Sequence, residues 1–237
     1  MFNVCAHCGL YSVDKLVTRP TRVTHASESR AHVNLQDEKL AAVATCKHCG
    51  HAHTFLRLPL LLIGGASATG KNAILQELAG CFSAAVLLEA DLLWLQEFEK
   101  PPAGHRRFFE TWLRLAKNIG QSRRPVTLFG AGLAVPENVE QCVERRYFSH
   151  THYLALVCDH NELQRRLRAR PAWRKSGQPE QLQEQLDFNR WLQKEGPLQT
   201  PGVTLLDTTD TTVEDSARAV KDWIARSLVL EPLRADE

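Results

Sequence analysis

The chain has 237 residues, of which 43% are hydrophobic and 24% charged, proportions that exclude a wholly disordered protein. Its formal net charge is +2, which gives no general reason to bind nucleic acid or an anionic membrane. The longest apolar stretch, residues 58–63, is far too short to span a bilayer, and the N-terminus has no secretory signal, so we expect a cytoplasmic protein whose seven cysteines are reduced or metal-bound.

The first 57 residues carry two copies of the pattern C-x-x-C-G, at Cys5 and Cys8 and at Cys46 and Cys49. The glycine after each pair lets the turn direct backbone N–H groups toward the sulfurs, and four thiolates match a closed tetrahedral Zn²⁺ site. The spacer between the pairs is longer than the roughly 15–20 residues common in such sites, so we expect an added hairpin. A redox-active C-x-x-C pair is the alternative, but the duplication with glycine favours zinc. We therefore predict a zinc-ribbon-like domain over residues 1–57.

Residues 58–230 alternate short apolar runs with amphipathic helical patterns. The runs are continuously apolar, as strands covered on both faces are, and they occupy residues 60–63, 85–89, 126–129, 153–157 and 203–206. Among the helical patterns are one that ends at Gly120, one that runs from Pro136 through Tyr147, and one capped by Asp159. The alternation predicts an α/β domain with a parallel sheet and right-handed crossovers. We expect residues 231–237 to form a polar, frayed tail, and the remaining cysteines to be buried, namely Cys81, Cys142 and Cys158.

The strongest motif follows the first of these strands. Residues 65–72 fit the pattern G-x-x-x-x-G-K between a strand and a helix. Glycines let successive backbone N–H groups form an anion nest, the helix N-terminus adds partial positive charge, and the lysine supplies a mobile cation. Asn72 stands where Ser or Thr usually offers a hydroxyl to Mg²⁺, so a water-bridged or shifted metal and a loss of catalytic power are the alternatives there. We predict that Lys71 is catalytic and that these residues bind a nucleotide: Gly65, Ala66, Ser67, Ala68, Thr69, Gly70, Lys71 and Asn72.

Two carboxylates mark the end of the second predicted strand, Glu89 and Asp91. Strand alternation places both on the same side at the carboxyl end, where open α/β sheets bind ligands. A carboxylate there can orient or deprotonate an acceptor hydroxyl, although a solvated strand end or a helix N-cap is the alternative. Gly130, after the third strand, permits close approach of a ligand or equally serves a tight turn. We predict that all three residues contact the acceptor and that Asp91 is catalytic.

A basic segment, residues 163–175, follows the fourth strand. Pro171 must end its helix near Arg170, and Arg166, four residues earlier, shares one helix face with Arg170. A guanidinium group binds phosphate bidentately and keeps its charge, whereas the alternative is a solvated helix end that favours the helix dipole. We predict that Arg170 is catalytic. Arg190 is a candidate ligand for the acceptor, with a surface role as the equal alternative.

These motifs together resemble the small P-loop kinase family that includes adenylate, shikimate and gluconate kinases. More closely, they resemble bacterial proteins described as AAA-family ATPases or nucleoside kinase-like proteins. The resemblance covers residues 60–228 and rests on the phosphate loop, the acidic end of the second strand, the pattern L-x-x-R-L-x-x-R before a lid, and residues 205–209. The chain departs from the family at Asn72, and its third strand lacks a clear terminal Asp.

The resemblance implies a five-stranded sheet in the order 2-3-1-4-5, a mobile lid, and the use of ATP with Mg²⁺. It implies that Arg166 lies against adenine and that Arg170 touches phosphate. It also implies that the loop from Asp207, with Thr208, lies near the adenine.

The sequence therefore predicts an ATP-dependent phosphotransferase that passes the γ-phosphoryl group to a small molecule near Asp91, such as a nucleoside or a nucleotide. One alternative is a nucleotide-binding regulatory module whose ribbon binds nucleic acid or a protein, and another is a polynucleotide-end kinase. Basic and aromatic residues gathered on the ribbon would favour nucleic acid, but Arg19, Arg22 and Arg30 are too sparse to decide. The acceptor and the oligomeric state stay open.

Overall fold

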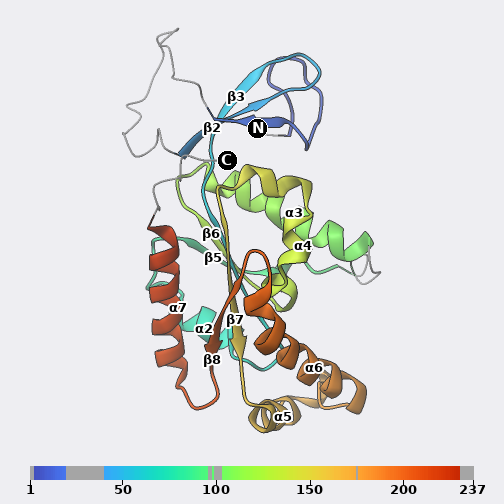
Figure 1. Ribbon diagram of the computed structural model, residues 1–237, viewed down its shortest axis with the longest axis vertical. Coiled ribbons are helices and arrows are strands. Elements are labelled where there is room, and N and C mark those ends of the chain that lie inside the picture. The colour runs from blue at the N-terminus through green and yellow to red at the C-terminus, as the bar shows by residue number, and fades with distance from the viewer. Residues whose placement is uncertain (1–2, 20–39, 96–97, 99–102, 175, 230–237) are drawn as a thin grey trace.

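The computed structural model describes residues 3–19, 40–95, 98, 103–174 and 176–229. Two sheets organise it, a five-stranded sheet in the middle of the molecule and a three-stranded sheet at one end (Figure 1). The predicted tail, residues 231–237, lies outside the described residues. Within the described part of the chain, no helix has both the length and the apolar character needed to cross a membrane.

The larger sheet is formed by the five apolar runs that the sequence indicated. Its strands, in spatial order, are β5 (Val86–Glu89), β6 (Val126–Phe129), β4 (Leu60–Gly65), β7 (Thr151–Val157) and β8 (Val203–Asp207). All neighbouring strands are parallel, and the central strand β4 is buried along its whole length. The predicted α/β fold with a five-stranded parallel sheet is therefore confirmed. Its strands all end at one edge, which is where such sheets bind ligands.

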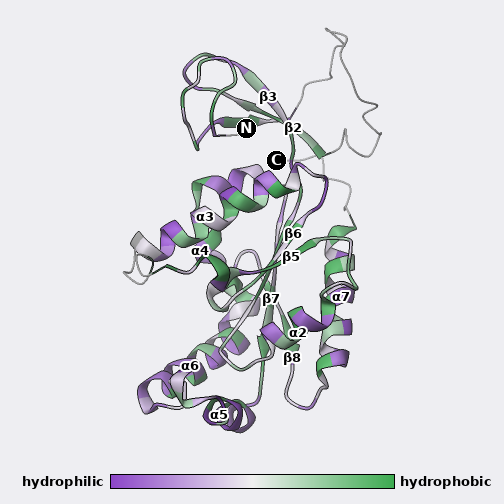
Figure 2. Cartoon of the chain, turned by 180° about the vertical axis from the view of Figure 1, so that it is seen from behind, coloured by the Kyte–Doolittle hydropathy of each residue, from purple (hydrophilic) through white to green (hydrophobic). Residues whose placement is uncertain are grey.

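Helices cover both faces of this sheet. One face carries α2 (Lys71–Leu78) and α7 (Val213–Leu228), and the other carries α3 (Ala103–Gly120), α4 (Pro136–Glu140) and α6 (Pro179–Glu195) (Figure 1). Alternate side chains of β4 supply the two cores, because Leu61 and Ile63 pack toward α2 and α7 while Leu60 and Leu62 pack toward α3. The outer helices keep polar surfaces, as the purple colour of α5 (His160–Arg168) shows in Figure 2.

An extension built from α5 and α6 lies beside the edge where the strands end. Leu163 and Leu167 of α5 pack against Leu182 and Leu186 of α6. Asp159 caps α5 as predicted, because its side chain accepts hydrogen bonds from two backbone N–H groups of the first turn. The helix ends at Arg168, two residues earlier than the sequence suggested.

The smaller sheet belongs to the N-terminal segment. Its strands β1 (Leu16–Thr18), β2 (Ala41–Thr45) and β3 (Ala52–Leu56) pair antiparallel in chain order. The hairpin predicted between the two cysteine pairs falls largely on residues 20–39, outside the described residues. Because β3 leads directly into β4, this sheet adjoins the edge where the strands of the larger sheet begin, opposite the edge where they end (Figure 1).

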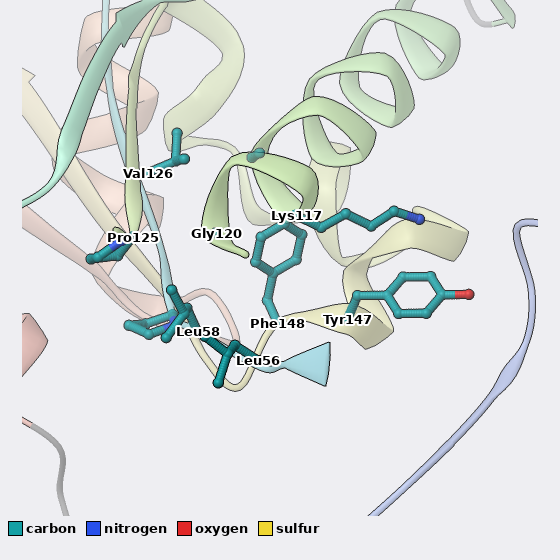
Figure 3. Close-up of a pocket in the computed structure, with 10 residues that line it drawn as sticks. Leu56, Leu58, Lys117, Gly120, Pro125, Val126, Tyr147 and Phe148 are labelled. Atoms are coloured by element: carbon teal, nitrogen blue, oxygen red, sulfur yellow. The ribbon is translucent and has the colours of Figure 1, made fainter. Parts of the chain in front are cut away.

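Buried polar contacts join the small sheet to the larger domain. The Tyr147 hydroxyl donates to the carbonyl oxygen of Val13 at 2.8 Å and accepts from the backbone N–H of Lys15 at 3.2 Å. Lys117 of α3 forms a buried ion pair with Glu144, and its ammonium lies 4.1 Å from the centre of the Tyr147 ring. Figure 3 shows the side chains of Lys117 and Tyr147 extending alongside each other, next to a cavity of about 10 Å³. The small sheet and the larger domain therefore pack directly against each other.

Two local expectations were wrong. The helix predicted from Pro136 through Tyr147 is broken, because Cys142 is extended and separates α4 from a 3₁₀ helix over Val143–Tyr147. The break turns Tyr147 toward the small sheet. Cys81 is exposed in the turn after α2, whereas Cys142 and Cys158 are buried as predicted.

Candidate functional site

The predicted nucleotide-binding loop joins β4 to α2 at the edge where the strands end. Gly65 has a φ of +142°, and a Cβ atom there would lie 2.4 Å from the carbonyl oxygen of Leu156, so this position requires glycine. Ala68 and Gly70 also have positive φ, at 67° and 102°. Left-handed residues between right-handed ones let successive N–H groups converge on an anion. The loop therefore has the backbone form that its sequence predicted.

Lys71 begins α2 and bends back over this loop. Its ammonium donates hydrogen bonds of 2.8 Å to the carbonyl oxygens of Gly65 and Ala66. Burial lowers the pKa of Lys71 to about 8, the carboxylate of Asp91 opposes that shift, and Arg170 adds to it. Asp91 and Arg170 thus lie near enough to Lys71 to affect its pKa.

The two predicted carboxylates are not related by strand alternation. β5 ends at Glu89, and Asp91 lies on the first turn of a 3₁₀ helix, Ala90–Leu93, where it is exposed. Glu89 accepts a hydrogen bond of 2.5 Å from the side-chain amide of Asn72 on α2. Glu89 is therefore directed toward the start of α2, and Asp91 acts on the ammonium of Lys71.

Thr208 and Arg166 form one end of the site. The Thr208 hydroxyl donates to the carbonyl oxygen of Thr69 in the loop at 3.1 Å. The Arg166 guanidinium donates to the carbonyl oxygens of Thr208 and Thr209, at 2.7 and 2.9 Å, and to Glu162 at 2.7 Å. These contacts tie the loop after β8 to the phosphate loop. They also hold the guanidinium of Arg166 in a fixed plane.

Arg170 lies at the other end of the site, beside Ser67. Both line a cavity of about 320 Å³ whose remaining walls come from the segment after α5 and from α6. Most of this wall carries no motif in the sequence and was not among the predicted site residues, namely Arg174, Ser176, Gln181, Glu184 and Gln185. The cavity is walled by polar side chains and two arginines, which suits a charged ligand.

Gly130 and Arg190 are not brought to these residues by any contact that the described part of the chain shows. A Cβ atom on Gly130 would lie 2.8 Å from the Cβ of Ala90, so the glycine allows the ends of β5 and β6 to pack closely. Arg190 is half-exposed and pairs with Asp187 on its own helix at 3.3 Å. These contacts favour the structural alternative for both residues.

The four N-terminal cysteines converge, as the repeated pattern predicted. The Sγ atoms of Cys5 and Cys49 are 3.6 Å apart, those of Cys8 and Cys46 are 3.9 Å apart, and all four lie within 4.8 Å of one another. A tetrahedral zinc with Zn–S bonds of about 2.3 Å requires S···S distances of roughly 3.8 Å, so the cluster fits that ion. Backbone N–H groups, that of Cys8 foremost, lower the pKa of the Cys5 thiol to about 5, whereas burial and the neighbouring cysteines raise the pKa of the Cys49 thiol to about 12. The spacing of the four sulfurs is therefore the feature that suits a metal.

Comparison with known proteins supports the fold. No protein-family model matches the chain, and no curated protein matches its sequence. Solved structures do match: a sugar kinase from Janibacter sp. HTCC2649, with a TM-score of 0.54 and 14% identity, over 74% of this chain and 99% of that one. A gluconokinase from Sinorhizobium meliloti 1021 matches with a TM-score of 0.52 and 18% identity, over 73% of this chain and 95% of that one. At these identities the likeness shows a P-loop kinase fold.

Proposed function

We propose that the chain is an ATP-dependent phosphotransferase that phosphorylates a small molecule such as a nucleoside or a nucleotide. The observation that carries this proposal is the loop between β4 and α2, which has the backbone form of an anion nest and lies under the ammonium of Lys71. Asp91 and Arg170, which both affect the pKa of Lys71, would add the carboxylate and the arginine that phosphoryl transfer needs. The structures that the chain resembles are described as kinases, which agrees with this choice.

ATP would lie along the phosphate loop. Its base would lie near Thr208 and Arg166, whose contacts tie the loop after β8 to Thr69. Its phosphates would accept hydrogen bonds from the N–H groups of residues 65–72, and Lys71 and Arg170 would neutralise the charge that develops on the γ-phosphoryl group. Desolvation by the cavity walls strengthens these charge interactions.

The acceptor would lie at Asp91. Its hydroxyl would donate a proton to the Asp91 carboxylate as its oxygen attacks the γ-phosphorus in line, and the bond from that phosphorus to the β,γ-bridging oxygen would break and release ADP. Asp91 is exposed at the edge where the strands end, so an acceptor can approach it from solvent. Because Glu89 is bonded to Asn72, we assign it to the start of α2 and leave Asp91 as the group that contacts the acceptor.

Mg²⁺ would lie at the start of α2, where Asn72 contacts Glu89. The carboxylate of Glu89 is a hard oxygen ligand of the type that Mg²⁺ prefers. When bound, the metal supplies charge neutralisation at the phosphates. In this arrangement the amide nitrogen of Asn72 orients Glu89, which compensates for the missing hydroxyl at position 72.

The N-terminal segment would be a zinc ribbon, with Zn²⁺ held by Cys5, Cys8, Cys46 and Cys49 in a structural role. We accordingly divide the chain into a ribbon domain, residues 1–57, a kinase domain, residues 58–230, and a tail, residues 231–237. Four thiolates around a metal suit a reducing compartment, so we place the protein in the cytoplasm.

A nucleotide-binding measurement combined with an acceptor screen tests this function. Full-length protein should bind ATP and ADP by calorimetry. One member of a panel of nucleosides, nucleotides, sugars and oligonucleotides should stimulate ADP release. Binding without stimulation by any acceptor would instead indicate a regulatory nucleotide-binding module, and an active oligonucleotide would indicate a polynucleotide-end kinase.

An Asp91→Asn variant makes the test specific. If Asp91 positions or deprotonates the acceptor, this change should reduce acceptor-dependent turnover by roughly 10²–10⁴ and preserve ATP affinity. Loss of ATP binding would instead place Asp91 at the metal. An unchanged turnover would return Asp91 to a structural role at the start of its 3₁₀ helix.

A further inference from the structure

A side chain of α6 contacts the phosphate loop directly. The backbone N–H of Ser67 donates a hydrogen bond of 2.7 Å to the Oε1 atom of Gln185. Gln185 is half-buried and comes from a segment 118 positions farther along the chain. A backbone N–H carries one hydrogen, so Gln185 and a phosphate oxygen compete for this donor. The contact therefore bears on what the loop can bind.

The position of Ser67 in the loop indicates which phosphate is concerned. Thr69 lies at the end of the loop that Thr208 contacts, where we place the nucleotide base. Ser67, two positions earlier, instead lines the cavity of about 320 Å³ together with Arg170 and Arg174. A phosphate chain that starts from the Thr208 side therefore reaches Ser67 with its last group. A triphosphate is long enough for this and a diphosphate is one group shorter.

We propose that Gln185 is a positioning residue that discriminates ATP from ADP, because it yields the Ser67 N–H to the terminal phosphoryl group of ATP and keeps it when ADP is bound. The proposal rests on the function proposed above. A phosphate oxygen is charged and is a stronger acceptor than a neutral carboxamide oxygen, so it displaces Gln185. Arg170, Arg174 and Glu184 line the same cavity, and because its two positive charges outnumber its one negative charge, the cavity favours this exchange.

The exchange affects one half of α6 more than the other. Asn189, one turn after Gln185, is buried and bonds both backbone groups of Cys158, accepting from its N–H at 3.1 Å and donating to its carbonyl oxygen at 2.7 Å. The second half of the helix is thereby fixed to the end of β7. The first half follows the segment that carries Arg174, and Gln185 ties it to the loop. ATP would release that tie and ADP would not.

Calorimetric titration of full-length protein with ADP and with a non-hydrolysable ATP analogue tests this inference. In Gln185→Ala, removal of the competing acceptor should increase the affinity for the ATP analogue by roughly 2- to 10-fold and leave the affinity for ADP unchanged. In Gln185→Glu, a charged acceptor should hold the Ser67 N–H and repel the terminal phosphate. The affinity for the analogue should therefore fall by roughly tenfold or more relative to the affinity for ADP. Gln183→Ala is the matched control, because Gln183 is exposed on the same helix and is not part of the cavity wall.

The outcomes separate this inference from the proposed function. If wild-type protein binds neither nucleotide, the proposed function fails. If it binds both, but Gln185→Ala and Gln185→Glu change the affinities for the ATP analogue and for ADP equally, Gln185 has only a structural role and the inference is wrong. The opposite signs expected for the two variants keep the test decisive if one of them folds poorly.

Discussion

The side-chain amide of Asn72 donates a hydrogen bond of 2.5 Å to the carboxylate of Glu89, the last residue of β5. This contact joins the first turn of α2 to the neighbouring strand end. It also occupies the one side chain whose identity departs from the usual phosphate-loop pattern. The carboxamide uses its nitrogen here, which leaves its carbonyl oxygen as an acceptor.

We expect an Asn72→Ser variant to need less Mg²⁺ for ATP binding. A serine hydroxyl on a short side chain reaches the metal directly, whereas Asn72 acts through Glu89 in our assignment. The free Mg²⁺ that gives half-maximal ATP affinity should fall by roughly tenfold or less, and it should rise in Glu89→Gln, which removes a charged ligand. Calorimetry over a series of Mg²⁺ concentrations measures both. A higher Mg²⁺ requirement in Asn72→Ser would show that the asparagine carbonyl is itself the ligand.

Arg170→Ala should cost about 2–4 kcal/mol of transition-state stabilisation, because it removes a cation aimed at the γ-phosphoryl group. Its effect on ATP affinity should be smaller. The measurement is kcat/KM with the acceptor found by the screen, beside the ATP dissociation constant. Arg168→Ala is the control, since Arg168 is exposed at the end of α5. If Arg170→Ala turned over at the wild-type rate, the catalytic role proposed for Arg170 would be wrong.

ATP binding should take up a proton at about pH 8.5. Burial lowers the pKa of Lys71 to about 8, so part of the population is neutral there, and bound phosphate raises that pKa because it favours the ammonium. Affinity should therefore be highest below pH 8 and fall as the pH rises through that value. Calorimetry in two buffers of different ionisation enthalpy counts the protons. Lys71→Arg should abolish the uptake, since a guanidinium stays charged, and an unchanged uptake would assign the proton to another group.

One Zn²⁺ per chain should be found by metal analysis of untagged protein after mild dialysis, because the four sulfurs have tetrahedral spacing. The double variant Cys46→Ser, Cys49→Ser should lose the metal. Cys81→Ser should retain it, since Cys81 is exposed and lies outside the cluster. Less than about half an equivalent in wild type, or full retention in the double variant, would contradict a zinc site.

Glu144→Gln should destabilise the protein by about 3–5 kcal/mol. The change removes the negative charge that pairs with the buried ammonium of Lys117, which costs more than the pair itself contributes. Arg114→Gln should cost about 1 kcal/mol or less, because Arg114 pairs with the same carboxylate at 3.1 Å from a side chain that is 39% exposed. Urea unfolding of both variants makes the comparison. Equal effects would mean that burial of the pair does not govern its energetics.

The strands and the phosphate loop could be predicted from the sequence because their signals are local. Five apolar runs marked β4 to β8, and glycines at fixed spacing before Lys71 marked the loop. The positive φ values in this loop agree with the backbone form predicted for it. The place of Glu89 and Asp91 at the carboxyl edge of the sheet could be anticipated because parallel strands all end at one edge. These inferences needed only the period of the pattern and the direction of the strands.

The contacts of Gln185 and Glu144 could not be predicted in the same way. Gln185 reaches Ser67 across 118 positions, and a glutamine on a half-buried helix has no pattern that distinguishes it from its neighbours. Glu144 looks like a surface residue between Val143 and Arg145, and only the break at Cys142 turns it inward. Both contacts depend on how separate elements pack, which no local periodicity records.

The buried pair of Lys117 and Glu144 lies where the two proposed domains, which we divide at residue 58, contact each other. Removing residues 1–57 would take away the carbonyl to which Tyr147 donates and the Asn3 amide that donates to Glu144, so both side chains would lose a partner. The sheets on either side of that boundary differ in topology, but we expect them to unfold as one cooperative unit. Heating should therefore melt the small sheet and the end of α3 in a single transition, and extraction of zinc by a chelator should lower the temperature at which the whole chain unfolds.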